Sequence, residues 1–222
     1  MALSRALAVC CIAPAAACFI FAGCAARVAS TTQPRDDSQL AVSVPSRVRE
    51  IQTRVIGLDT TSQQMPGAND QSHRQLVGQY FADLTRVLPL IEGEYQSGEF
   101  RQGMRVLNSS REQLTAGSPD LASEPTIGQG LRAAERLLRN LNSFIFDNDA
   151  GITKNLDALQ ARINSLDTAH GAVNRVLSAQ AIRTATEILQ QMSTALAERS
   201  RVDAPTTNPA TKPEAAPAAA AQ

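Results

Sequence analysis

The 222-residue chain has a formal net charge of zero, and its acidic and basic side chains are interspersed along the sequence. No basic patch alternates with aromatic residues, so the sequence excludes the electrostatic pattern of a nucleic-acid-binding protein. Hydrophobic residues make up 43% of the chain, which is enough for a core, but aromatic residues make up only 4%. This composition favours an all-helical domain over a strand-rich one.

The first 26 residues have the layout of an export signal. Arg5 is followed by an apolar run from Ala6 to Ala26, in which Pro14 is an interruption. A short basic start, an apolar stretch and small residues beyond it are typical of a signal peptide. A run of about 20 apolar residues can also span a bilayer as an anchor. The four cysteines of the chain all lie in this segment: Cys10, Cys11, Cys18 and Cys24.

The apolar run ends in "FAGC", residues Phe21 to Cys24, where a large apolar residue and two small ones precede a cysteine. This segment resembles the lipobox of bacterial lipoproteins, although Phe21 stands where that class usually has Leu. The resemblance implies that residues 1–23 are a signal peptide, and that Cys24 receives a diacylglyceryl group and becomes the acylated N-terminus. Ala25, directly after the cysteine, implies an outer-membrane location facing the periplasm.

Two other interpretations of the leader remain open. It can be kept as an uncleaved N-terminal anchor, or it can be cleaved near "VAS", Val28 to Ser30, with ordinary secretion of the product. All three interpretations place residues 31–222 outside the cytoplasm. Residues 24–44 are rich in Ser, Thr, Gln and Asp, and we expect them to form a flexible tether with a reach of about 25 Å.

Helical periodicity begins near Pro45, which suits a first helical turn. The apolar residues of this first helix step by three and four: Val48, Ile51, Val55 and Leu58. Residues 59–69 contain a Pro-Gly pair and are predicted to form a loop. A second helix is predicted from Asp70, which has the character of an N-cap, and Pro89 should kink or end it.

Four further helical segments are predicted along the chain. Apolar residues mark a third helix over residues 100–114 and a fourth from Ser123 to Ile145, and "DNDAG" at residues 147–151 provides the next break. Residues 152–166 and 182–196 then repeat apolar side chains at heptad spacing. This seam is typical of nearly antiparallel packed helices. The sequence therefore predicts an all-α fold of five or six helices, either an up-and-down bundle or an irregular array, coiled-coil-like in its C-terminal half.

The chain ends in a segment rich in Pro, Ala and Thr without an apolar period, over residues 201–222. Such a composition cannot bury enough surface to offset its ordering entropy, so it predicts disorder. The expected organisation is a signal peptide, a tether, a helical domain and a tail, over residues 1–23, 24–44, 45–200 and 201–222.

Two histidines raise the possibility of a metal or small-ligand site. His73 and His170 each lie three residues after an aspartate, Asp70 and Asp167, so that each pair shares one face of a helix. If the helices alternate up and down, both pairs lie at the same end of the bundle. Ferritin-like di-iron bundles use a similar spacing, but with Glu in place of Asp and with further Glu ligands. Ordinary capping and packing roles for these residues are the alternative, so we assign no metal and no cofactor.

Two shorter motifs suggest structure rather than chemistry. "DNDAG" lacks the bidentate acid and the glycine position of an EF-hand loop, so it predicts a plain interhelical turn. The segment 93–107 resembles the turn and second helix of a tetratricopeptide repeat, with Gly98, Phe100 and Gly103 at the characteristic places. One copy cannot form a repeat array, so a single α-hairpin is expected there.

No catalytic motif occurs in the sequence, and an enzyme has no positive support. We expect a non-enzymatic envelope protein that contacts membrane lipid through acylated Cys24. It would present a helical surface to a protein partner, or to a second copy along the seam from Ile152 to Leu196. A metal- or ligand-binding bundle built on the two Asp–His pairs is the alternative.

Overall fold

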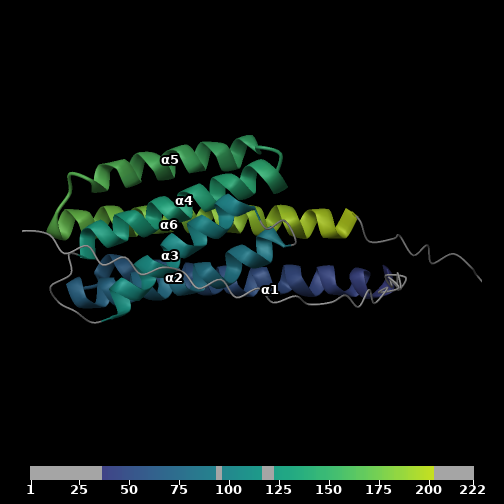
Figure 1. Ribbon diagram of the computed structural model, residues 1–222, viewed down its shortest axis with the longest axis horizontal. Coiled ribbons are helices and arrows are strands. Elements are labelled where there is room, and N and C mark those ends of the chain that lie inside the picture. The colour runs from purple at the N-terminus through teal and green to yellow at the C-terminus, as the bar shows by residue number, and fades with distance from the viewer. Residues whose placement is uncertain (1–36, 94–96, 117–122, 203–222) are drawn as a thin grey trace, which may run out of the picture. The chain divides into compact units, whose positions relative to one another are not determined.

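A computed structural model describes residues 37–93, 97–116 and 123–202, which all belong to one compact unit (Figure 1). Within these ranges the regular structure is entirely helical, and the predicted all-α fold of five or six helices is confirmed. The elements are α1 Asp37–Gln64, the 3₁₀ helix η1 Met65–Gly67, α2 Asp70–Glu92, α3 Gly98–Thr115, α4 Ser123–Ile145, α5 Ala150–Leu166 and α6 Gly171–Val202.

Short polar residues begin three of these helices. Asn69, Ser97 and Asp149 each accept a hydrogen bond from the backbone N–H three residues later, at 2.9–3.0 Å. These bonds satisfy donors that a helix start leaves without an intrahelical partner. The predicted cap at Asp70 is therefore wrong by one residue, because Asn69 fills that role. "DNDAG" forms the interhelical turn that was predicted, with Asp149 as the cap of α5.

Helix α1 is longer at both ends than the sequence indicates. It begins at Asp37, so the last eight residues of the expected tether are helical, and Pro45 lies inside the helix rather than in its first turn. At the other end α1 continues into the predicted loop. Thr61 and Ser62 are buried there, and their hydroxyls donate to backbone carbonyls of the same helix at 3.2 and 2.8 Å. Because these polar groups are satisfied locally, the helix extends without apolar residues.

Helix α2 continues past Pro89 to Glu92, so this proline stands in the last turn. The helix ends at Gly93, whose backbone has a φ of 68° and whose N–H donates to the Pro89 carbonyl at 3.0 Å. A positive φ is accessible to glycine at no steric cost, which explains the stop. The tail boundary also shifts by two residues, because α6 ends at Val202, and residues 203–222 lie outside the described part of the chain.

The six helices form two groups. Each helix packs against its neighbours in the chain, and α6 closes the ring by packing against α1. The helices α2, α4 and α6 also pack against one another, and we call them the inner helices. The outer helices α1, α3 and α5 each lie against two inner helices. This arrangement buries one continuous apolar core among all six.

The three inner helices run parallel to one another and antiparallel to the outer ones. Tyr80 of α2 contacts Thr186 of α6, and Arg199 near the end of α6 contacts the last residue of α4. We call the end that holds the first residues of the inner helices the N-end and the opposite one the C-end. Helix α1 begins at the C-end, where α6 also finishes (right in Figure 1). This is the up-and-down arrangement expected for helices joined by short connections.

Charged residues cap the inner helices from neighbouring elements. At the C-end, Arg47 of α1 donates to the last carbonyls of α2 at 2.6 and 3.2 Å, and Arg199 donates to the Ile145 carbonyl at 2.5 Å. At the N-end, the Glu124 carboxylate accepts the backbone N–H of Gly171 at 2.6 Å. Cations at helix C-termini and anions at N-termini are both stabilised by the helix dipole.

The heptad seam of the C-terminal half packs against other helices of the same chain. Its α5 residues and most of its α6 residues are buried: Ile152, Leu156, Leu159, Ile163, Leu166, Ile182, Ala185, Leu189 and Met192. Helix α5 packs with this stripe against α4 and α6. The expected self-association along the seam would therefore require the bundle to open, and a second copy would need a different surface.

Candidate functional site

Cys24, the predicted lipidation site, lies outside the described residues, together with the rest of the leader and residues 25–36. Lipidation therefore remains a prediction from the sequence. Within residues 37–202 two regions bear on function. One is the set of polar contacts at the N-end that includes the predicted Asp–His pairs, and the other is a groove between α3 and α4.

His73 is buried in the interface between α2 and α6. Its side chain is 2% exposed, and its Nε2 lies 2.8 Å from Oγ of Ser178. The Ser178 hydroxyl donates to the Arg175 carbonyl at 3.0 Å, so it accepts a hydrogen bond from Nε2–H of the neutral imidazole. The other ring nitrogen, Nδ1, has no hydrogen-bond partner among the residues that the structure describes. Burial lowers the pKa of His73, so this residue is a neutral packing element.

The other predicted residues take surface contacts. Asp70 pairs with Arg175 at the start of α6. The exposed His170 ring places Nδ1 3.1 Å from a carboxylate oxygen of Glu124. This hydrogen bond, together with the one from the Gly171 N–H, lowers the pKa of Glu124. All of these groups stabilise the junction between the starts of the inner helices.

Asp167, the fourth member, forms an ion pair with Arg132 at 2.7 Å. The expectation that both Asp–His pairs lie at one end of the bundle is confirmed, but the four residues take four different partners. The expectation that each pair shares a helix face is wrong for Asp167 and His170, because α5 ends at Leu166 and α6 begins at Gly171. Among the described residues no three His, Cys, Asp or Glu side chains group as metal ligands would. The metal-binding alternative therefore has no support from the geometry of this end.

The second region is a groove of about 690 Å³ between α3 and α4. Gly103 brings the two helices together, since a Cβ at that position would lie 2.8 Å from the Leu137 side chain. The close helix approach implied by the half-motif at residues 93–107 is therefore present, and Phe100 packs behind it. The groove is lined by Glu99, Phe100, Gln102, Gly103, Val106, Gln129, Arg132, Ala133, Arg136, Leu137, Arg139, Asn140, Ser143 and Phe144.

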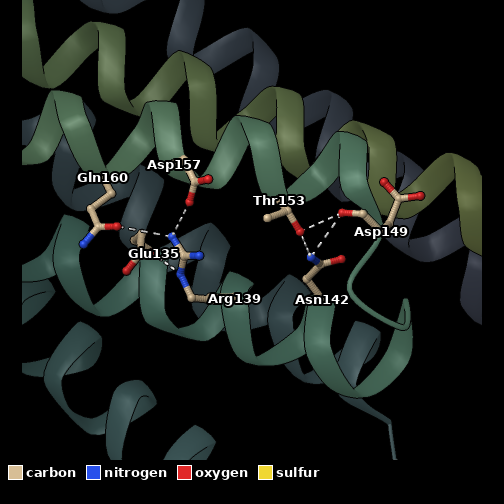
Figure 2. Close-up of polar contacts among 7 residues, drawn as sticks. All are labelled: Glu135, Arg139, Asn142, Asp149, Thr153, Asp157 and Gln160. Atoms are coloured by element: carbon tan, nitrogen blue, oxygen red, sulfur yellow. Dashed lines mark hydrogen bonds and ion pairs between the residues drawn. The ribbon is translucent and has the colours of Figure 1, made fainter.

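A polar network fixes the side of α4 that faces α5 (Figure 2). Arg139 donates to Glu135 at 2.8 Å, to Asp157 at 3.2 Å and to Gln160 at 3.4 Å. The hydrogen bond to Glu135 is the main reason why the pKa of Arg139 is raised. One turn further along, Asn142 donates to the Thr153 hydroxyl at 3.0 Å. These contacts hold α4 in a defined rotation, and with it the wall of the groove.

Three arginines of α4 border the groove at positions 132, 136 and 139. Arg132 and Arg139 are paired with carboxylates of the bundle. Arg136 lies between them on the exposed face, and no carboxylate of the described residues pairs with it. The exposed Phe144, with 49% of its surface accessible, stands at the C-end of the same groove. The groove thus combines an apolar floor, one carboxylate, Glu99, that accepts a hydrogen bond from Asn140, and one cation, Arg136, that has no partner in the described bundle.

Sequence reasoning did not identify this groove. The available signal is weak, because arginines at i, i+4 and i+7 on an amphipathic helix usually mark only its solvated face. The groove depends on how closely α3 approaches α4, which is a property of the packed bundle.

Comparisons with known proteins give no match to this chain, neither with family models, nor with curated proteins, nor with solved structures. Among the helices of the described residues, none has both the length and the hydropathy that a membrane span requires. Interpretation of the chain therefore depends on its own residues and their geometry.

Proposed function

We propose that this protein is an exported bacterial lipoprotein, held through acylated Cys24 in the outer membrane and facing the periplasm. It works there as a non-enzymatic interaction component of the envelope. The observation that carries the proposal is the apolar run from Ala6 that ends in Phe21–Cys24, after which the chain has no further cysteine. Loss of the leader would leave a mature chain with a single, lipid-blocked thiol, which suits an oxidising compartment.

The arrangement of α1 and α6 supports an anchored bundle. Helix α1 begins at Asp37, so the twelve residues 25–36 separate Cys24 from the C-end. A flexible chain of this length reaches about 20 Å, shorter than the reach expected for a tether to residue 44. In the proposed orientation the C-end faces the lipid surface and the N-end points away from it.

A binding role also agrees with the chemistry of the described residues. His73 and Ser178 form a histidine–hydroxyl pair, but the side chains are 2% and 0% exposed, so a substrate cannot reach them. Exposed large apolar residues occur instead on the outer surface of α1 and on the first turns of α6: Ile56, Val173 and Val176. Single exposed apolar side chains are ordinary, but Val173 and Val176 are three residues apart on one helix and so share a face that is available for contact with another protein.

Expression of the full chain in a diderm bacterium grown with labelled palmitate tests the anchor. We expect label in the wild-type protein and an N-terminal peptide that begins at acylated Cys24 in mass spectrometry. Cys24→Ser should lose the label and keep the leader. Cys18→Ser is the matched control and should behave like the wild type, because Cys18 lies upstream of the cut. An unmodified N-terminus near Ser30, or an uncleaved chain, would contradict the proposal.

Site-specific photo-crosslinking in cells tests the interaction role. A photoreactive residue at Ile56, Val173 or Val176 should give a discrete adduct with an envelope protein from at least one position. A buried position such as Leu138 serves as the negative control. No adduct from any of the three exposed positions would contradict a role as an interaction component.

A further inference from the structure

The α3–α4 groove has the composition of a peptide-binding surface. Its floor is apolar and includes Phe100, and Phe144 stands exposed at its C-end. Amide side chains lie on both walls, Gln102 on α3 and Gln129 on α4, and the Asn140 amide donates across the groove to the Glu99 carboxylate at 3.3 Å. An acyl chain needs no hydrogen-bond partner, whereas an extended peptide backbone needs donors and acceptors, and amides supply both. The groove therefore suits a peptide better than a lipid tail.

The charged residues of the groove indicate which side chain a bound peptide should carry. Arg136 is exposed between two arginines whose guanidinium groups are already paired within the bundle. An arginine fork matches a carboxylate in geometry as well as in charge. A peptide that carries one acidic side chain would complement this position.

The last described residues of α6 lie at the same end of the bundle as Phe144 of the groove. Helix α6 ends at Val202, and Arg199, three residues earlier, donates to the Ile145 carbonyl and lies over the Phe146 ring at 5.5 Å. The end of α6 is thereby fixed to the last turn of α4. Phe144, at the mouth of the groove, belongs to that same turn.

The C-terminal segment of the same chain fits the groove in composition and length. Residues 203–222 place a proline at every fourth position, and Glu214 follows the third of them: Pro205, Pro209, Pro213 and Pro217. Proline-rich segments bind aromatic-lined grooves because their extended form costs little ordering entropy. Twenty residues extend to about 60 Å, whereas the groove along α4 from position 144 to 129 measures about 22 Å. The segment is therefore long enough to turn around the end of α4.

We propose that residues 203–222 dock in the α3–α4 groove of their own chain, with prolines against Phe100 and Phe144 and Glu214 on Arg136. The composition of the segment predicts disorder in isolation because it cannot bury its own surface. A pre-formed groove supplies that surface, and the covalent link gives a high effective concentration. The docked segment covers apolar surface that a partner would otherwise meet. This inference does not depend on lipidation of Cys24.

Paramagnetic relaxation in the full chain tests the docking. The native cysteines are replaced by serine, a nitroxide is attached at Thr211→Cys, and amide signals are recorded in detergent. We expect a several-fold loss of signal intensity at Gln102 and Asn140 in the groove. Amides of Asn155 and Gln191, which line the α5–α6 surface, are the internal reference and should keep their intensity.

Charge variants of the labelled chain then test the predicted pair. Arg136→Glu should restore the groove signals, and the additional change Glu214→Arg should quench them again. Arg183→Glu, which reverses an exposed arginine of α6 outside the groove, is the matched control and should leave the quenching in place. Equal signal loss over both surfaces, or no loss at Gln102 and Asn140, would overturn the proposal. Correct folding of each variant is checked by the unchanged signals of buried residues.

Discussion

The inner and outer helices of this bundle are built on different principles. Helix α4, an inner helix, buries twelve residues, whereas the outer helix α3 buries three. An inner helix contacts four other helices, so residues around most of its circumference must pack against neighbouring side chains. An outer helix contacts two, and its remaining face is free to be polar. Alternate helices of the chain therefore differ in how many of their residues must pack against other helices and how many are free to be polar.

The inner interfaces accordingly contain small and polar residues where a periodicity analysis expects large apolar ones. Gly130 of α4 faces the Phe81 ring, and a Cβ there would lie 2.3 Å from a ring carbon. Tyr80 is fully buried and forms a hydrogen bond with Thr186 at 3.0 Å, and its burial raises its pKa. Specific fit, rather than apolar content alone, defines these interfaces.

Truncation of a buried aromatic residue on an inner helix should cause the largest loss in the free energy of unfolding. Phe81→Ala removes a ring that is 0% exposed, and we expect a loss of about 3–5 kcal/mol in the free energy of unfolding. Phe144→Ala is the matched control at an outer-facing position and should cost less than about 1 kcal/mol. Urea unfolding of the full chain, followed by far-UV circular dichroism, measures both. Because both residues belong to inner helices, similar losses for the two variants would contradict the difference between the buried and the exposed face of an inner helix.

Two glycine-to-alanine substitutions, one on an inner and one on an outer helix, should change the free energy of unfolding in opposite directions. Gly130→Ala should destabilise the protein by about 1–3 kcal/mol, because the added methyl group meets the Phe81 ring. Gly57 belongs to outer helix α1, and a Cβ added there would meet no neighbouring atom within 4 Å. Gly57→Ala should therefore raise the free energy of unfolding by about 0.5–1 kcal/mol, because alanine has the higher helix propensity. Thermal and urea unfolding measure both shifts. A stabilising Gly130→Ala would show that α2 and α4 are less closely packed than described.

The arginine that caps an inner helix from an outer one should have an intermediate effect. Arg47→Ala removes two hydrogen bonds to the last carbonyls of α2, and we expect a loss of about 1–2 kcal/mol. Arg49→Ala, at an exposed position of the same helix, should change the free energy of unfolding by less than about 0.5 kcal/mol. Equal effects of the two changes in urea unfolding would rule out a specific capping role for Arg47.

The smallest effect near neutral pH should come from His73, and it becomes visible on acidification. Because the folded-state pKa is lowered from 6.5, the unfolded chain binds a proton that the folded chain does not accept. The stability contribution is present above pH 6.5 and is lost as the pH falls from 6.5 towards the folded-state pKa. Urea unfolding at about pH 7.5 and about pH 5.5 measures this slope. His73→Gln should flatten it, and an unchanged slope in the variant would contradict the assignment.

Much of the fold could be predicted from the sequence because apolar periodicity is a local signal. The helices and the turn at residues 147–151 were recognised in this way, and the Asp–His pairs were placed at one end of the bundle. The extension of α1 was missed, because the burial of Thr61 and Ser62 depends on hydroxyl bonds that only a formed helix provides. The separation of the two Asp–His pairs was missed because their actual partners, such as Ser178 and Arg132, are distant in sequence.

The groove could not be predicted for a related reason. Gly103 and Leu137 are 34 positions apart, and although the half-motif around Gly103 is compatible with a close helix approach, nothing in either segment identifies Leu137 as the residue that it meets. A periodic pattern identifies which face of a helix is apolar, but not which helix covers it or how closely.

Residue spacing along the chain was enough to predict the helical class and the lengths of most helices, and it is also the basis of the prediction that Cys24 is lipidated. These properties depend on residues that lie close together in the chain, where spacing decides the outcome. Packing between the helices fixed which of them lie inside and which outside, which histidine is buried, and where an exposed groove is left. Those outcomes depend on contacts between helices, whose energies are fixed by how side chains fit across an interface rather than by their order in the sequence.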